Sequence, residues 1–230
     1  MSPRFAIYFV PPPNSRLATF GNAVLGYDCD RGAPVPQVPL SAIDADEMRQ
    51  MTQSPAQYGF HATLKAPFRL RTGRSESDLR TALDAFCGNR RPVSIGRLVV
   101  EQMGAFFALR PAENTKSVDD LAADCLQAFD EFRAPPPVDE CERRRTAGLT
   151  PRQDALLDRW GYPYVLDEFR FHLTLAGPLP EERRETWRKA LREAFAALAS
   201  ESWEIDAVAM ARQDGPKTPF RVVHRAKLAG

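Results

Sequence analysis

The sequence is poor in cysteine and histidine, and it has no long hydrophobic run. Its four cysteines lie far apart and none form a CxxC pair, which argues against a zinc ribbon or a dithiol redox site. We therefore expect reduced thiols and a cytoplasmic protein. No apolar run approaches the ~18 residues of a membrane-spanning helix. The N-terminal residues also lack the layout of a signal peptide.

An excess of charge of one sign is also missing. The net charge is +1, so the chain has no general basic field of the kind that binds long nucleic acids. Hydrophobic residues make up 43% and charged residues 27%, which is ordinary for a soluble globular protein. With 230 residues, the chain can form one large domain or two small lobes with an ample core.

One short segment is present twice. Residues 60–67 read FHATLKAP and residues 171–178 read FHLTLAGP, so Phe, His, Thr, Leu and Pro recur at the same positions. Two of the chain's three histidines fall inside this repeat. A single histidine on a strand is more often structural than catalytic, but a duplicated His-x-Thr motif favours a catalytic pair.

Alternating apolar and polar residues predict that each copy is a short strand that stops at its proline. Residues two apart on a strand point to the same side. His61 and Thr63 should therefore share one face, as should His172 and Thr174, while the opposite faces are apolar. Each strand thus offers an imidazole and a hydroxyl on one side and a core on the other.

The order of the other elements repeats with the motif. Strands are predicted over residues 4–10, 59–66, 93–100, 105–110, 168–176, 203–212 and 220–228. A first helix is predicted from a cap at Asn14 or Ser15 to near Gly26. Further helices are predicted over residues 41–53, 75–87, 117–133, 151–160 and 181–199. Each motif strand is followed by a helix and two strands. We therefore predict an α+β fold of one domain with two pseudo-symmetric lobes of antiparallel sheet and helices on the outer faces. The lobes would cover about residues 1–100 and 101–230 and enclose a central groove.

The paired motif resembles the two-histidine (2H) phosphoesterase superfamily, which includes bacterial RNA ligase-like cyclic phosphodiesterases. Three longer segments are similar to one branch, which is encoded beside phosphonate-degradation genes. These are YGFHATLKAPF at residues 58–68, GLTPRQ at residues 148–153, and WGYPY at residues 160–164 leading into FRFH at residues 169–172. The resemblance extends over essentially the whole chain.

The resemblance implies a metal-independent phosphoesterase that acts on a cyclic phosphodiester of a small molecule, without a cofactor. By its resemblance to this branch, the expected substrate is a phosphoribosyl or related intermediate of phosphonate metabolism. His61 and His172 would be the general base and general acid, with their order undecided. Thr63 and Thr174 would donate hydrogen bonds to the phosphate oxygens.

Four further residues are candidates for binding the substrate. Lys65 and Arg170 lie at even offsets from the two histidines, so each should share its histidine's face and reach a phosphate. Tyr8 and Tyr58 can stack on a base or a sugar, although packing in the core is the stronger interpretation.

The sequence does not decide the role of several charged or loop-rich segments. The run Arg143, Arg144 and Arg145 can bind a terminal phosphate or can belong to a solvated charged loop. His224 lies in a basic terminal strand and is assigned to the surface. Residues 26–39 and 134–161 are loop-rich segments bounded by prolines, and either can act as a lid. Oligomeric state is not predicted.

Other functions compete with this one. Two histidines can bind zinc, but no third ligand stands at a typical spacing, so no metal site is predicted. A phosphodiesterase acting on RNA or nucleotide 2′,3′-cyclic phosphates is the alternative within enzymes. A phosphorylated-ligand binding protein is the alternative outside them. A bell-shaped pH profile would indicate catalysis, whereas anion binding alone should weaken steadily as the histidines lose their protons.

Overall fold

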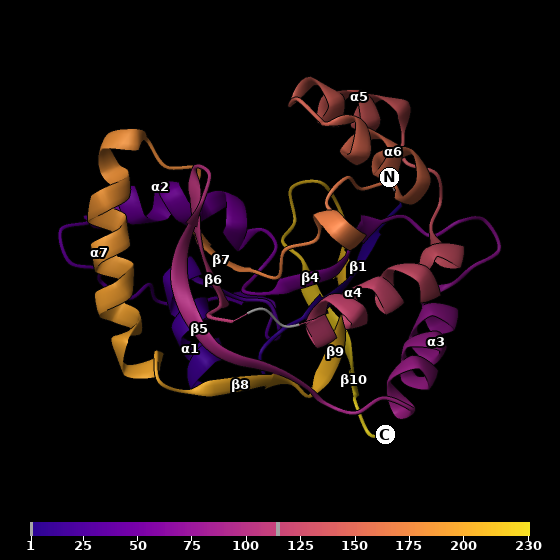
Figure 1. Ribbon diagram of the computed structural model, residues 1–230, viewed down its shortest axis with the longest axis horizontal. Coiled ribbons are helices and arrows are strands. Elements are labelled where there is room, and N and C mark those ends of the chain that lie inside the picture. Colours follow the sequence, from indigo (N-terminus) through magenta and orange to yellow (C-terminus); the bar gives the residue numbers. More distant parts are fainter. Residues whose placement is uncertain (1, 114–115) are drawn as a thin grey trace.

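The computed structural model describes residues 2–113 and 116–230 and contains two four-stranded antiparallel sheets (Figure 1). The first sheet has the order β10 (Arg221–Lys227), β9 (Ala207–Gln213), β1 (Arg4–Phe9) and β4 (Ala62–Phe68). The second has the order β7 (Leu173–Ala176), β6 (Phe106–Pro111), β5 (Val93–Met103) and β8 (Ser202–Ile205). A small hairpin joins β2 (Tyr27–Asp28) to β3 (Ala33–Pro34).

Seven α-helices lie within the described ranges: α1 (Arg16–Leu25), α2 (Ala45–Ala56), α3 (Glu76–Gly88), α4 (Lys116–Ala128), α5 (Val138–Thr146), α6 (Pro151–Trp160) and α7 (Arg184–Phe195). Short 3-10 helices cover η1 (Asp130–Phe132), η2 (Leu166–Glu168), η3 (Glu181–Arg183) and η4 (Ala196–Leu198). Helix α3 packs on β9 and β10, while α7 packs on β5. Across the described parts of the chain, no helix combines the length and the apolar character that crossing a membrane requires.

The predicted α+β class with antiparallel sheets is confirmed, and so is the order of one helix and two strands after the first motif. After the second motif, the strand predicted over residues 203–212 is two strands in different sheets, β8 and β9, so three strands follow α7. The division of the chain at about residue 100 is wrong for the sheets. Strand β9, from the end of the chain, pairs with β1 and brings β10 into the first sheet, whereas β6 pairs with β7 and belongs to the second sheet together with β5. Strand propensity is a local property and does not specify which strand is the neighbour, so the sequence pattern could not show this exchange.

Local signals explain most of the helix starts. The Ser15 hydroxyl accepts a hydrogen bond from the Ala18 amide, and Thr150 forms a capping box with Gln153 ahead of Pro151 at the first helical position. The run Arg143–Arg145, for which the sequence allowed a solvated loop, belongs to helix α5. Two of its three acidic residues, Asp139 and Glu140, occupy the first turn and its arginines the last, as the helix dipole favours.

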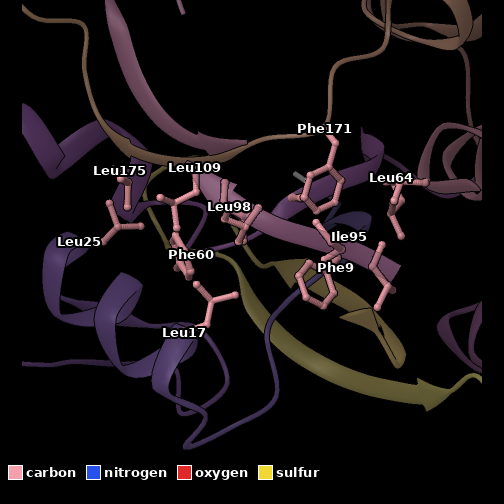
Figure 2. Packing of buried hydrophobic residues seen from close by; sticks show 14 of the residues in the cluster. Phe9, Leu17, Leu25, Phe60, Leu64, Ile95, Leu98, Leu109, Phe171 and Leu175 are labelled. Atoms are coloured by element: carbon pink, nitrogen blue, oxygen red, sulfur yellow. The ribbon is translucent and has the colours of Figure 1, made fainter. Parts of the chain in front are cut away.

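The two motif strands share one hydrophobic core. Phe60 and Leu64 from the first motif pack in the same cluster as Phe171 and Leu175 from the second (Figure 2). Helix α1 lies so close that a Cβ on Gly21 would overlap the Phe60 ring. Because the apolar sides of both strands enter this cluster, their polar sides turn away from it.

The ends of the motif strands differ slightly from the prediction. The second strand does stop before Pro178, but β4 continues through Pro67 to Phe68. Strand β4 is the edge of its sheet, where a residue that cannot donate to the ladder is tolerated. Both histidines lie immediately before their strands rather than inside them.

Candidate active site

Both motif strands are edge strands, β4 in the first sheet and β7 in the second (Figure 1). The phenylalanine before each histidine is buried, with Phe60 1% and Phe171 4% exposed, and it anchors the histidine to the core. The imidazoles of His61 and His172 are both half-buried. The structure brings the two motifs together, because Phe60 and Phe171, the residues just before the two histidines, pack in the same core cluster.

The His61 imidazole is held by hydrogen bonds to both ring nitrogens. Its Nδ1 lies 2.9 Å from the Gly59 carbonyl oxygen, and its Nε2 lies 3.1 Å from the Thr63 hydroxyl. A carbonyl only accepts, so Nδ1 carries the proton in the neutral ring and Thr63 donates to Nε2. Gly59 has a φ of +75°, and a Cβ there would overlap the Cys29 side chain, so this turn requires glycine. The predicted pairing of His61 with Thr63 on one face is confirmed.

The His172 imidazole repeats this arrangement. Its Nδ1 donates to the carbonyl of Arg170, 2.7 Å away, which again is the residue two positions earlier. The centre of the Phe106 ring lies 5.7 Å from the centre of the imidazole. In both motifs a backbone carbonyl fixes the tautomer and leaves Nε2 as the nitrogen that can take or give a proton.

Burial sets the protonation of both histidines. Desolvation is the largest influence on His61 and lowers its pKa to about 4, against the opposing effect of the Gly59 hydrogen bond. Desolvation also lowers the pKa of His172, and the nearby Arg110 guanidinium adds to that effect. Both imidazoles are therefore neutral in the free protein at neutral pH.

Both tyrosines predicted as candidates lie beside His61. The Tyr8 ring is 3.8 Å from the imidazole centre, and the half-buried Tyr58 ring is 6.3 Å away. Tyr58 also stacks on Phe220, with ring centres 5.4 Å apart. Burial raises the pKa of Tyr8 well above its ordinary value, so its hydroxyl stays protonated as a hydrogen-bond donor.

The prediction for Lys65 is wrong. Its ammonium is buried and donates to the Leu126 carbonyl at 3.0 Å and to Asp130 at 3.2 Å, on the side of helix α4. The even-offset rule fails because β4 is irregular. The pairing shifts between Tyr8↔Thr63 and Ile7↔Lys65, which inserts an extra residue into the strand.

Arg170 is exposed and lies next to His172 in the fold. Its guanidinium donates to the carbonyls of Asp167 and Phe169, so its contact with His172 is made by its backbone carbonyl. Its side chain lines a pocket of about 450 Å³ together with Arg110 and Phe171. The charged end can therefore reach a ligand in that pocket.

Sequence reasoning missed Arg110. This residue stands on β6, whose pairing with β7 places Ala108 opposite Thr174. Two positions further along the strand, Arg110 shares that face and forms an ion pair of 2.6 Å with Glu101. Since β6 and β7 are far apart in the sequence, only their pairing identifies Arg110 as a neighbour of His172.

Two of the remaining charged candidates are held by carboxylates outside the motifs. His224 is bonded to Asp84 at 2.6 Å, and Arg145 pairs with Asp154 and Asp158 of helix α6. Residues 2–113 and 116–230 contain no group of three or more His, Cys, Asp or Glu side chains placed to hold a metal ion.

A model of the family described as "Protein of unknown function (DUF1045)" matches residues 63–221. Ribose 1,5-bisphosphate phosphokinase PhnN of Janthinobacterium sp. (strain Marseille) is 38% identical over 231 residues, which are 99% of this chain and 51% of that protein. The protein of the same name from Laribacter hongkongensis (strain HLHK9) is 40% identical over 187 residues, covering 80% of this chain and 42% of that protein. The chain thus spans about half the length of the curated relatives it matches.

Solved structures with a similar arrangement include TT0787 of Thermus thermophilus, at a TM-score of 0.48 and 16% identity over 99% of this chain and 98% of that one. E. coli LigT complexed with 3′-AMP has a TM-score of 0.44 at 12% identity, and both chains are covered completely. These likenesses assign no activity to the chain.

Proposed function

The chain belongs to the DUF1045 family, and we propose that it is a metal-independent phosphoesterase that opens a cyclic phosphodiester of a small molecule. The observation that carries this proposal is that the imidazoles of His61 and His172 are held in the same tautomer by equivalent hydrogen bonds. Each has its Nδ1 proton held by the carbonyl two residues earlier, which leaves Nε2 as the nitrogen that can take or give a proton. In His61 this nitrogen accepts from the Thr63 hydroxyl. Hydrolysis of a phosphodiester needs such a pair, because one group must take a proton and another must give one.

The chemistry follows from the charge of the substrate. Both imidazoles are neutral in the free protein, and a bound phosphate anion raises the pKa of each, so that one can become protonated. The neutral imidazole takes a proton from the attacking water, the P–O bond of the ring breaks, and the imidazolium gives its proton to the departing oxygen. The hydroxyls of Thr63 and Thr174 and the guanidinium of Arg110 supply the donors for the charge on the phosphate.

The name of the two curated relatives is more informative about the substrate of this chain than about its reaction. The phosphokinase name belongs to proteins about twice as long as the matched segment. This chain has no Gly-Lys pair and hence no GxxxxGK[ST] loop to hold the phosphates of ATP. The substrate in that name, ribose 1,5-bisphosphate, supports a phosphorylated ribose as the substrate class here. The resemblance of the motifs adds phosphonate breakdown as its metabolic setting.

A nucleotide 2′,3′-cyclic phosphate is the second candidate substrate. Tyr8 and Tyr58 favour it, because their rings flank His61 and every nucleobase has a face that can stack on an aromatic ring. The same two histidines would carry the reaction.

Turnover in EDTA of a panel of cyclic and open phosphodiesters tests the proposal. The panel holds ribose cyclic phosphates, nucleoside 2′,3′-cyclic phosphates and bis(p-nitrophenyl) phosphate. We expect the wild type to hydrolyse at least one cyclic phosphate in EDTA, and His61→Ala and His172→Ala each to lower kcat about 10²–10⁴-fold.

His224→Ala is the matched control, because it removes the third histidine beside Asp84 and should keep wild-type turnover. Loss of wild-type activity in EDTA would contradict metal independence. Equal rates in the wild type and the two motif variants would contradict the histidine mechanism.

A further inference from the structure

An ion pair on the second sheet lies beside the second motif. Nη1 of Arg110 on β6 donates to Glu101 Oε1 on β5, at 2.6 Å. Both residues line the pocket of about 450 Å³ that also contains Arg170 and Phe171, the two residues before His172. Strands β5, β6 and β7 run side by side in this sheet (Figure 1). The pair is therefore next to the second histidine in the fold.

Glu101 stands in the same row of the sheet as Thr174. Ala108 on β6 is paired with Glu101 of β5 on one side and with Thr174 of β7 on the other. Residues that lie directly opposite one another on neighbouring strands have their side chains on the same face. The Glu101 side chain is therefore on the face that carries the His-x-Thr motif.

Arg110 stands two positions further along β6, on the same face and beside His172. The pairing of β6 with β7 ends one residue before Arg110 and one residue after His172. These two residues come next on their strands and lie across from each other. Burial has the largest effect in lowering the pKa of the His172 imidazole, and the Arg110 guanidinium lowers this pKa further, as a nearby cation does.

The first motif has apolar residues at both of these positions. In the first sheet, the row that contains Thr63 ends in Ala209, which takes the place of Glu101. Val10 follows the last pair of β1 with β4 and takes the place of Arg110. Both apolar residues are buried, Ala209 with 0% and Val10 with 3% of the surface exposed. The charged pair therefore belongs to the second motif alone and is not part of the repeated scaffold.

The bond to Glu101 occupies only one side of the Arg110 guanidinium. Glu101 binds Nη1, whereas Nε and Nη2 form a second edge with two parallel donors. Nε is buried and has no hydrogen-bond partner within residues 2–113 and 116–230. A buried donor without a protein partner is uncommon and is found where a ligand or water completes the bond. Two parallel donors match two oxygens of a phosphate.

Stability does not account for this pair. The Glu101 side chain is 45% exposed and the Arg110 side chain 28%, and ion pairs between such side chains add little to stability. A free arginine side chain samples many rotamers, and a bond to one of its nitrogens removes most of that freedom. Holding Nη1 therefore restricts where the edge formed by Nε and Nη2 can point.

We propose that Glu101 is a positioning residue, which holds Arg110 so that its Nε and Nη2 meet the phosphate on which His172 acts. The inference rests on the proposed function and adds a residue to it. Glu101 does not touch the substrate and acts through Arg110. Because the first motif has no such pair, the phosphate receives this two-donor contact from the side of His172 only.

The first test measures the pKa of His172 by NMR in the free protein, with its resonances identified by their absence from His172→Gln. Arg110→Gln should raise this pKa by roughly 0.5–1, because it removes the nearby cation. Glu101→Gln should also raise it, because a released Arg110 side chain moves away from the imidazole. If Glu101 acted by its charge alone, its loss would lower the pKa instead.

The second test is a double-mutant cycle on kcat/KM for the cyclic phosphate that the wild type opens fastest. We expect Arg110→Gln to lower kcat/KM about 10²-fold and Glu101→Gln about 10-fold. Adding Glu101→Gln to Arg110→Gln should change nothing further, because the effect of Glu101 passes through Arg110.

Glu204→Gln is the matched control, because this exposed carboxylate lies on β8 of the same sheet, outside the pocket. It should leave both the pKa of His172 and kcat/KM at their wild-type values. Thermal unfolding of Glu101→Gln should match that of the wild type, since the pair is exposed.

The proposal is overturned if Arg110→Gln or Glu101→Gln fails to raise the pKa of His172. It is also overturned if Glu101→Gln has the same effect on kcat/KM with and without Arg110. A raised pKa in both variants of a protein that opens no cyclic phosphate would contradict the proposed function and leave the positioning of Arg110 by Glu101 standing. Turnover of a cyclic phosphate without a rise in the pKa would do the reverse.

Discussion

At the scale of single residues, one backbone carbonyl determines what each histidine can do. Gly59 and Arg170 occupy the same position relative to His61 and His172, and each accepts the Nδ1 proton. A lone histidine with two free nitrogens can exist as either tautomer, whereas these two are fixed with the proton on Nδ1 and Nε2 as the basic nitrogen. Burial then keeps both rings neutral until an anion binds.

This burial predicts how stability depends on pH. The pKa of His61 falls from 6.5 to about 4 on folding, so the unfolded chain binds the proton more readily than the folded one. Stability is then fully present above pH 6.5 and is lost as the pH falls towards 4, by on the order of 1–3 kcal/mol. In urea titrations at pH 7 and pH 5, His61→Gln should lose less stability than the wild type. His172→Gln should likewise lose less stability between pH 7 and pH 5 than the wild type. If both variants lose as much stability as the wild type over this range, the burial argument is contradicted.

At the scale of elements, an irregularity in β4 places Lys65 on a different side of the strand from His61 and Thr63, although the sequence pattern predicted one shared face. His61 and Thr63 face the site, but the register shift after Thr63 turns Lys65 towards α4 and η1. There Lys65 pairs with Asp130, which Arg133 also contacts at 2.7 Å. The ammonium of Lys65 therefore joins the first sheet to the helix that covers it.

Lys65→Met should accordingly affect stability and not catalysis. Loss of the buried ammonium leaves the Leu126 carbonyl unpaired and removes one of the three cations around Asp130, which keeps Arg133 and Arg159, at a cost of about 1–3 kcal/mol. Activity on a cyclic phosphate should stay within about twofold of the wild type if Lys65 does not touch the substrate. The matched control is Lys116→Met, which breaks an exposed pair with Asp120 and should cost less than about 0.5 kcal/mol. A large rise in KM in Lys65→Met, without loss of stability, would return Lys65 to the substrate.

At the scale of the whole molecule, the two halves of the chain are interlocked. Each sheet takes strands from both halves, and the chain changes sheets at Asp206, between β8 and β9. Helix α2 from the first half contacts the start of α7 from the second, where Glu47 accepts bonds from Arg183 and from the fully buried Trp187. Such crossing contacts favour unfolding in a single transition.

Glu47→Ala tests that coupling. The Trp187 indole N–H, 2.8 Å from the carboxylate, would lose its acceptor, and the ion pair with Arg183 would be lost with it. We expect a loss of about 1–3 kcal/mol, measured by urea unfolding, in one transition followed equally by fluorescence and circular dichroism. Glu47→Gln keeps an acceptor for the Trp187 indole and should lose less stability than Glu47→Ala. Two separate transitions in the wild type would show that the halves unfold independently.

The sequence by itself determined which side of each motif strand carries the polar residues and where the capped helices begin. The period of two in FHATL and FHLTL was enough to place each histidine and threonine on one side and the core on the other, because side-chain direction along a strand is a local property. The capping residues of α1 and α6 likewise act on amides within the same turn.

The tertiary structure alone decided which segments became neighbours. The pairing of β6 with β7 brings Arg110 to His172, and the return of β9 to β1 sets Gln213 beside Arg4. The register shift in β4 removed Lys65 from the site, and the fold gave Arg69 and Arg144 a common pocket. These outcomes depend on strand partners and packing between residues far apart in the chain, and no local pattern of side chains encodes them.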